Sequence, residues 1–562
     1  MSQKTPQSSY TGPIVVDPLT RVEGHLRIEV EVENGKVSNA RSVGTLFRGL
    51  ETILKNRDPR DVQHFTQRIC GVCTYVHGLA STRALENACY NADNSFHIPA
   101  NATYIRNLVL GMQQIHDHVV HFYHLHALDF VDITSALKAD PEKAAKLSES
   151  MTPRPCKVDD LKAVQARLKA FVETGQLGPF TNAYFLGGHP AYYLEPEANL
   201  IATAHYLEAL HMQCEMARGT AVFGGKNPHP QFLVHGGVTC YEALTDKRIK
   251  EFEDILKKSV KFVNEVYLPD LLLVGSAYKD WAGIGGTTNF MTMGEFPMAG
   301  DEFDVSTRWM KPGIIYKRDL AKVDPFDPNK IKEHIAHSWY DGDWAKAPYE
   351  ESTDPKFTRM GDTDRYTWLK APRYNDTATE TGPLAAVLVN YAKGHEDFKP
   401  LVDKVLGALG ATPEALFSTL GRTAARAIQC AATCKHTTDL LEQYKENIKT
   451  DKQIVIDRPV PKESQGVGFV EAPRGGLSHW MVIKNGRVDN FQAVVPTTWN
   501  LGPRDGFGKL GPCEEALINT PVADPKRPVE ILRTVHSFDP CIACAVHVID
   551  GKTNEVHEFK VL

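Results

Sequence analysis

The sequence lacks the features of a membrane protein, of a chain with its own secretory leader, and of a nucleic-acid binder. None of its 562 residues belongs to a run near the roughly 18 apolar residues of a membrane span. The first residues, Met1 to Ser9, have no apolar signal core. The formal net charge is -6 at pH 7, without a basic excess. We expect no transmembrane segment, no signal peptide and no nucleic-acid partner.

Nucleotide-binding motifs are also missing. The glycines of 283–286 follow no clear strand, and 224–227 lacks the serine or threonine of a phosphate-binding loop. We therefore expect neither NAD nor any other nucleotide. The 11 cysteines are an odd count, unlike a secreted disulfide framework. Beyond the pairs described next, no set has the spacing of a ferredoxin-like cluster.

Four cysteines form two C-x-x-C pairs at opposite ends of the chain. Cys70 and Cys73 lie in one pair, and Cys541 and Cys544 in the other. Thiols three positions apart can face one metal ion. From spacing alone, a structural zinc site is the leading interpretation and a redox disulfide is the second. Zinc modules, however, usually hold both pairs within tens of residues, and soft thiolates also select nickel and iron.

Two other groups of metal-ligand residue types are better explained as core. Five histidines between His116 and His126 follow one helical pattern but do not share a face, so core and interface histidines are favoured over a metal cluster. Cys430 and Cys434, four residues apart in a helical stretch, are favoured as buried free thiols over a metal half-site.

The patterning predicts a mainly α-helical fold with small peripheral antiparallel β-hairpins. Apolar and polar residues alternate over 25–32, just before Asn34-Gly35, and again over 479–488, which contains Asn485-Gly486. Asn-Gly dipeptides favour the type I′ turns of hairpins. Apolar residues recur at helical steps after Asn101, a candidate N-cap. The stretch 301–374 is rich in proline, charge and aromatics, and predicts a long surface insertion. Further helices are expected at 197–218, 246–266, 382–394 and 413–444.

The residues that flank the cysteines carry a family resemblance. Arg68-x-Cys70-Gly71-x-Cys73-x-x-x-His77, Asp539-Pro540-Cys541-x-x-Cys544-x-x-His547 and Arg21-Val22-Glu23-Gly24-His25 occur in this order. Together they resemble the large, catalytic subunit of periplasmic nickel-iron hydrogenases, of the uptake type found in sulfate-reducing bacteria. The resemblance covers the chain from about Gly12 onward. It implies one domain over 1–547, a helical core around a buried bimetallic centre.

This resemblance implies reversible heterolytic cleavage of dihydrogen. Cys70 and Cys541 would be terminal nickel ligands, while Cys73 and Cys544 would bridge nickel to an iron that carries cyanide and carbon monoxide. Such chemistry needs a metal, a nearby base and a pocket that excludes water. A closed zinc site would leave no open coordination position.

Glu23 is the residue that we expect to take the proton. The alternative is that Glu23 only pairs with Arg21. Arg474 is the rival base, but a guanidinium stays protonated, so electrostatic and cyanide-binding roles come first. By resemblance, Asp117 lies beside the active site and anchors an arginine. The remaining residues implied around the cyanide ligands are Pro473, His77 and Thr497, whose hydroxyl supplies a donor.

A third metal ion is implied by Glu51 and His547, together with the backbone carbonyl of Ala493. Oxygen and nitrogen ligands suit magnesium or a second iron. The resemblance further implies an iron-sulfur small subunit with a twin-arginine signal, a cytochrome-type acceptor beyond it, and periplasmic export of the pair. A hydrogen-sensing relative and a zinc-stapled structural protein remain the alternative functions.

The family also implies C-terminal processing. Its mature chains end at the last histidine of the cysteine motif, here His547, after an endopeptidase cuts before Val548. The predicted propeptide 548–562 carries five charged residues, and burying them unpaired would be costly. We expect this tail to lie outside the core. The charged residues are Asp550, Lys552, Glu555, Glu558 and Lys560.

Overall fold

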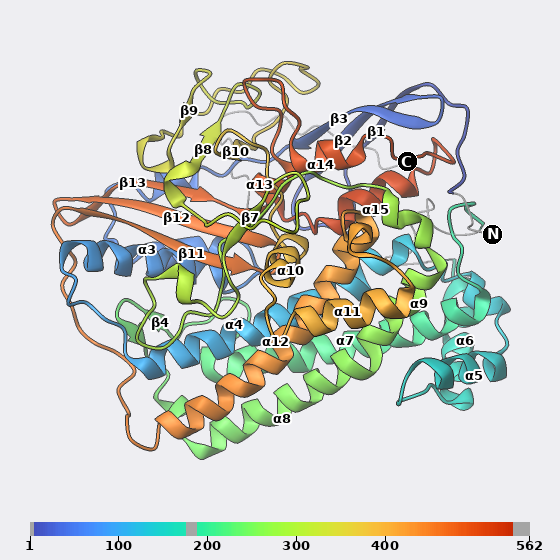
Figure 1. The fold of residues 1–562 in the computed structure, drawn as a ribbon, viewed down its shortest axis with the longest axis horizontal. Helices are drawn as coiled ribbons and strands as arrows, with labels where there is room; N and C mark the ends of the chain where they lie inside the picture. The colour runs from blue at the N-terminus through green and yellow to red at the C-terminus, as the bar shows by residue number, and fades with distance from the viewer. Residues whose placement is uncertain (1–4, 176–187, 543–562) are drawn as a thin grey trace.

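The computed structural model describes residues 5–175 and 188–542, and long helices form its body (Figure 1). The central helices are α4 (Ala100–Val120), α7 (Pro196–Gly224), α8 (Asp246–Phe262) and α12 (Thr419–Asn447), which pack against one another. The others are α1 (Leu50–Ile53), α2 (Val62–Thr66), α3 (Val76–Ala92), α5 (Pro141–Met151), α6 (Val158–Glu173), α9 (Leu268–Ala277), α10 (Pro383–Ala392), α11 (Lys399–Leu409), α13 (Pro496–Leu501), α14 (Pro512–Leu517) and α15 (Val529–Ser537).

The predicted central helix exists, although it begins differently. Pro99 occupies the N-cap of α4, and the Asn101 side chain donates instead to the carbonyl oxygens of Asp451 and Gln453, both at 3.1 Å. The N-cap prediction is therefore wrong. The helix continues as a π-helix over His121–His126. Most of α4 is buried, since α7 and α12 both pack on it.

Small antiparallel sheets lie at the side of this body (Figure 1), as predicted. Both Asn-Gly turns are confirmed: Asn34 and Gly35 have φ of 49° and 72°, and Asn485 and Gly486 have 52° and 69°. A third strand joins each hairpin. The sheets are β1 (Gly12–Val16), β2 (Leu26–Glu33) and β3 (Lys36–Gly44); β11 (Ser464–Ala472), β12 (Gly475–Lys484) and β13 (Arg487–Val494); β8 (Ile331–His334), β9 (Ala345–Lys346) and β10 (Ala371–Tyr374); β4 (Leu233–Val234) and β5 (Gly237–Val238); and β6 (Phe290–Thr292) and β7 (Gly313–Ile315).

The stretch 301–374 is not a surface insertion. It contributes β7 to β10, and the side chains of Arg308, Trp339 and Arg373 are fully buried within it. Arg373 pairs with Asp505 at 2.9 Å where neither side chain is exposed. Polar composition misled the prediction because the charges are paired inside the fold.

Close backbone packing brings the first cysteine motif against the second sheet. A Cβ at Gly466 or Gly468 of β11 would lie 2.3 Å and 2.0 Å from the carbonyl oxygens of Ala84 and Ala80 in α3. Only glycine permits this approach. Helix α3 starts just after Cys73, so this packing sets the motif beside the turn that carries Arg474. Within the described residues, no helix is long and apolar enough to cross a membrane.

Candidate metal centre

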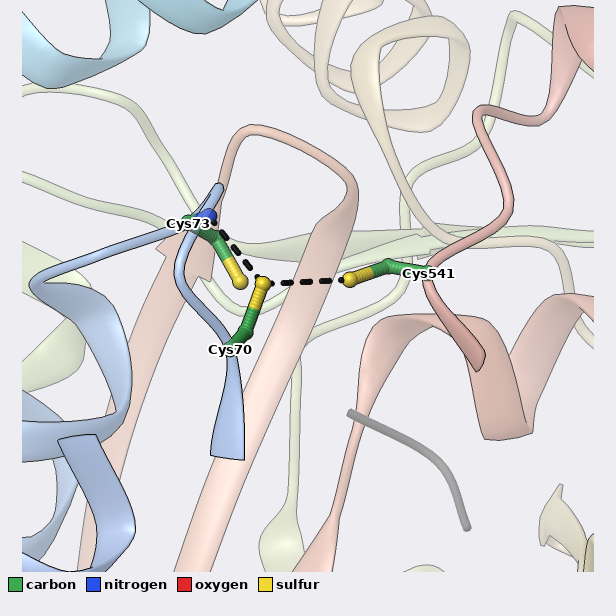
Figure 2. A group of neighbouring side chains, drawn as sticks. All are labelled: Cys70, Cys73 and Cys541. Atoms are coloured by element: carbon green, nitrogen blue, oxygen red, sulfur yellow. Dashed lines mark hydrogen bonds between the residues drawn. The ribbon is translucent and has the colours of Figure 1, made fainter. Parts of the chain in front are cut away.

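Three of the four predicted cysteine ligands meet in the interior. Figure 2 shows Cys70 and Cys73 on one loop and Cys541 on a separate segment, with their sulfurs facing one another. The Cys70 and Cys541 sulfurs are 3.4 Å apart, and all three lie within 4.8 Å of one another. We call these residues the three-thiol cluster. A disulfide needs about 2.05 Å, so the sulfurs are unbonded, and among the described residues no other group has metal-ligand geometry.

Cys544, the fourth predicted ligand, lies outside the described residues, as do His547, Val548 and the predicted propeptide. The three described thiols are 0 to 4% exposed. Backbone amides of Val72 and Cys73 donate to the Cys70 sulfur at 3.3 Å and 3.2 Å, as expected for a sulfur that carries negative charge. The cluster is therefore shielded from solvent, and two backbone amides can stabilise negative charge on the Cys70 sulfur.

The two ends of the chain are joined at the cluster by backbone pairing. The Glu23 amide donates to the carbonyl oxygen of Pro540 at 3.3 Å, and the Ile542 amide donates to that of Glu23 at 2.8 Å. This parallel bridge sets Glu23 beside Cys541. Its carboxylate Oε2 lies 3.3 Å from the Cys541 sulfur. The motif at residues 21–25 therefore supplies a carboxylate, that of Glu23, at the edge of the three-thiol cluster.

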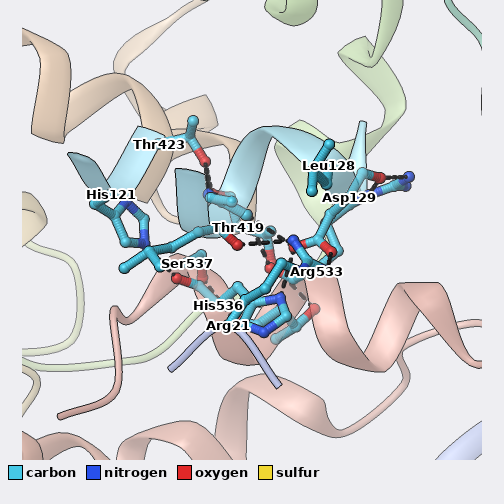
Figure 3. Close-up of polar contacts among 12 residues, drawn as sticks. Arg21, His121, Leu128, Asp129, Thr419, Thr423, Arg533, His536 and Ser537 are labelled. Carbon is cyan, nitrogen blue, oxygen red and sulfur yellow. Dashed lines mark hydrogen bonds and ion pairs between the residues drawn. The ribbon is translucent and has the colours of Figure 1, made fainter. Parts of the chain in front are cut away.

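Arg21, which precedes that glutamate, is held by a different carboxylate. Figure 3 shows its contact with Asp129, 2.5 Å between Nη2 and Oδ1. His536 contacts the same carboxylate through Nδ1 at 2.7 Å and the Thr20 carbonyl through Nε2 at 2.8 Å. His536 thus links the Asp129 carboxylate to the backbone of Thr20. Asp129 is therefore one carboxylate partner of Arg21.

Arg474 stands on the turn between β11 and β12 in a set of buried charges. Its Nη1 is 3.8 Å from Asp117 Oδ2, and its Nη2 is 3.0 Å from Asp539 Oδ1. Burial alone would lower the pKa of the guanidinium, but Asp539, Cys541 and Cys73 raise it well above its ordinary value. The predicted partner Asp117 is present, although Asp539 is closer.

Asp539 belongs to the second cysteine motif, which by itself assigns it no role. It also lies 3.4 Å from Arg426 Nη1, which donates to the carbonyl oxygen of Pro473 at 3.0 Å and lies 3.4 Å from His118 Nδ1. Its φ of 55° is unusual for a residue before proline. An Asp-Pro dipeptide directly before a metal-ligand cysteine is the signal that could have identified it.

The other predicted neighbours of the centre are buried and hydrogen-bonded. The Thr497 hydroxyl oxygen accepts from the Cys541 amide at 3.0 Å, which leaves its own proton to donate elsewhere. His77 Nδ1 is 3.1 Å from His479 Nε2, and His479 Nδ1 is 2.8 Å from the Ser81 hydroxyl. Burial lowers the pKa of His77 to about 4, so this imidazole is neutral at pH 7.

Glu51 and Ala493, predicted around a third metal ion, are neighbours. The Ala493 amide donates to Glu51 Oε1 at 3.2 Å. Next to them the Lys370 ammonium contacts Glu351 at 2.6 Å and Glu333 at 3.3 Å, and is 3.9 Å from Glu51 Oε2. Burial raises the pKa of both Glu333 and Glu351. The region is rich in carboxylate oxygen and almost closed to solvent.

The histidines of the central helix are core residues where buried. His118, His121 and His126 are 0 to 2% exposed, and burial lowers the pKa of each. His121 Nε2 lies 2.7 Å from the His536 carbonyl oxygen. Cys430 and Cys434 are also buried free thiols. The interpretation of these cysteines and of the buried histidines as core residues agrees with their burial.

Three comparisons describe what the chain is similar to. The model of the nickel-dependent hydrogenase family matches residues 48–547, and a model described as HoxL-like matches 13–43. The chain is 45% identical to the uptake hydrogenase large subunit of Rhizobium leguminosarum bv. viciae, over 98% of this chain and 97% of that one. It is 44% identical to the Hydrogenase-2 large chain of Escherichia coli K12, over 98% and 99%. The Ni-Fe-Se hydrogenase of D. vulgaris Hildenborough superposes with a TM-score of 0.78 at 34% identity, covering 96% of this chain and all of that one.

Proposed function

Since the chain belongs to the nickel-dependent hydrogenase family as a large subunit, we propose that Cys70, Cys73, Cys541 and Cys544 hold the nickel-iron centre at which it oxidises dihydrogen. The protein is an oxidoreductase with the fold of nickel-iron hydrogenase large subunits. The observation that carries the site assignment is the three-thiol cluster, assembled from both ends of the chain beside Glu23.

The donor set fits the implied metals. Soft thiolates select nickel and iron, and the described sulfurs are buried, unbonded and close enough to share ions. When bound, a nickel-iron centre with cyanide and carbon monoxide ligands supplies the metal site for heterolytic cleavage of dihydrogen. A zinc-only structural site is not favoured, since the nickel-dependent hydrogenase family match covers all four cysteines.

Glu23 receives the proton in our proposal. Its Oε2 lies 3.3 Å from the Cys541 sulfur, within reach of direct proton transfer. The backbone bridge to Pro540 and Ile542 fixes the residue on one side. Asp129, by holding Arg21, fixes it on the other. The carboxylate is thus positioned by backbone and ion pair before any substrate arrives.

Arg474 orients charge and does not carry the proton. Asp117 and Asp539 hold its guanidinium, and the Cys541 and Cys73 sulfurs favour its charged form. A fixed cation over thiolates stabilises negative charge in a dry site. With the centre bound, the Thr497 hydroxyl proton would be available to a cyanide ligand, and Pro473 and His77 would lie around the same ligands.

We further propose a structural magnesium or iron ion held by Glu51, the Ala493 carbonyl and His547. The contact between Glu51 and Ala493 and the surrounding carboxylates support an oxygen-rich site. Lys370 neutralises part of this charge. Removal of the ion by a chelator is expected to lower thermal stability while nickel content is retained.

A small subunit is the partner that a hydrogenase large subunit requires. We propose that it carries iron-sulfur clusters, passes electrons to a cytochrome-type acceptor, and brings this chain to the periplasm by its own signal. The similarity to uptake hydrogenases supports this direction of electron flow. Recovery of both subunits from the cytoplasmic fraction alone would contradict the proposed location.

C-terminal processing is the proposal for 548–562, which would leave 1–547 as the mature domain. The family model ends its match at residue 547, in agreement with cleavage between His547 and Val548 by a maturation endopeptidase. The expected intact mass of active enzyme from its host is that of a chain ending at His547. Fully active enzyme with a chain ending at Leu562 would refute cleavage.

Infrared spectroscopy tests the assigned centre. Iron-bound cyanide and carbon monoxide absorb where protein does not, so the purified heterodimer is expected to show these bands together with nickel and iron in elemental analysis. Zinc without nickel, and no such bands, would instead favour the structural alternative. A hydrogen-sensing relative would show the bands but little turnover.

A further inference from the structure

Outside the metal centre, a cysteine, a histidine and an aspartate form a linear relay near the surface. Cys156 lies between α5 and α6, and its sulfur is 3.3 Å from Nε2 of His205 in α7. Nδ1 of the same ring contacts both carboxylate oxygens of Asp270 in α9, at 2.9 Å and 2.8 Å. The Tyr123 hydroxyl donates to that carboxylate at 2.7 Å. Helices α5 and α6 pack on α7 at one end of the body (Figure 1).

The order of these contacts suits activation of a thiol and not a metal site. The imidazole stands between sulfur and carboxylate, so the three ligand atoms do not converge, and this group is absent from the candidate metal sites of the described residues. A carboxylate that orients a histidine beside a nucleophile is the arrangement that generates a reactive thiolate.

Protonation of the ring follows from the same geometry. His205 is 4% exposed and Asp270 is 2% exposed, and a buried carboxylate needs a partner that offsets its desolvation. Burial would lower the pKa of His205, but Asp270 and then Cys156 raise it to about 10. At neutral pH the ring is therefore an imidazolium, and it faces the sulfur.

The backbone and the charged residues around Cys156 also affect the electrostatics at its sulfur. Cys156 comes just before Lys157, the N-cap of α6, where the helix dipole favours a nearby anion and the Asp159 and Asp160 carboxylates of the first turn oppose one. Its own amide donates to the Ser148 hydroxyl at 2.9 Å, which fixes the loop. Two neighbouring carboxylates, Glu208 and Glu265, are paired with Arg154 at 2.8 Å and 3.8 Å. Cys156 is partly exposed, whereas Cys430 and Cys513 are buried.

We propose that Cys156 is a nucleophilic cysteine, a site of reversible mixed-disulfide formation with small-molecule disulfides. The thiolate attacks one sulfur of the disulfide, whose S–S bond breaks as the new bond to Cys156 forms. The released half leaves as a thiolate and takes a proton from the His205 imidazolium or from water. A small thiol reverses the exchange. This site is independent of the proposed metal centre, since it shares no residue with it.

Cys214 supplies an internal control, because it is more exposed than Cys156 and its sulfur donates a hydrogen bond to the carbonyl oxygen of Leu210 in its own helix. In a pulse of iodoacetamide on the native heterodimer at pH 7, peptide mass spectrometry is expected to show Cys156 alkylated about tenfold faster than Cys214. Exposure alone gives the reverse order. Equal or slower labelling of Cys156 would overturn the proposal.

Asp270→Asn tests the relay. The variant is expected to slow alkylation of Cys156 about tenfold and to leave the Cys214 rate unchanged; an unchanged Cys156 rate in the folded variant would refute the relay. If the variant does not fold, the relative alkylation rates of Cys156 and Cys214 in the native protein decide whether Cys156 is activated. Oxidised glutathione is expected to add to the native chain and not to Cys156→Ser. Nickel content, measured in parallel, reports on the metal centre separately.

Discussion

Replacing Cys541 by serine is expected to reduce nickel content and hydrogen uptake to background. The Cys541 sulfur is 3.4 Å from that of Cys70 and is fully buried, so it has no substitute among the described thiols. A serine hydroxyl is a hard and weakly acidic ligand, which binds nickel poorly in place of a thiolate. Elemental analysis and hydrogen-dependent dye reduction measure the two losses.

Cys513→Ser is the matched control for that variant. Cys513 is also fully buried, in α14, but belongs to the second hydrophobic core and not to the three-thiol cluster. We expect it to lower thermal stability and to keep nickel. Full nickel occupancy and normal turnover in a Cys541→Ser protein would refute the assignment of the nickel-iron centre to these cysteines.

Glu23→Gln is expected to retain nickel and iron but to lose isotope exchange between dihydrogen and water protons by about 10²- to 10⁴-fold, the range for a positioned acid-base group. Glutamine keeps the shape and the backbone bridge to Pro540 and Ile542, but it cannot take a proton. Infrared bands of the iron ligands should remain, because Glu23 is not one of the proposed thiolate ligands. Mass-spectrometric detection of HD measures the exchange.

Two variants make the result specific. Glu31→Gln removes an exposed carboxylate from β2 and is expected to leave exchange unchanged. Arg474→Lys keeps the positive charge but loses the planar fork that contacts Asp117 and Asp539. If Glu23→Gln exchanged normally while Arg474→Lys, with metals retained, did not, the proton role would pass to Arg474.

Local chemistry made part of the fold predictable. Asn34-Gly35 and Asn485-Gly486 adopt the positive φ values of their turns whatever surrounds them, so both hairpins could be predicted. The third strands β1 and β11 could not, because a longer loop separates β1 from β2, and the Pro473-Arg474 turn between β11 and β12 carries no Asn-Gly signal. The stretch 301–374 misled for a related reason: Arg373 is polar in sequence but neutralised by Asp505, which lies far along the chain.

By itself the sequence determined the chemistry of the protein: two thiol pairs, a glutamate motif near the start and a histidine motif near the end, in the order of a hydrogenase large subunit. Only the tertiary structure decided which carboxylate holds which arginine. Asp129 takes Arg21 and Asp539 lies closest to Arg474, and the relay at Cys156 exists only where α7 and α9 meet. The physical reason is that motifs depend on neighbours along the chain, whereas buried charges find their partners through the packing of distant elements.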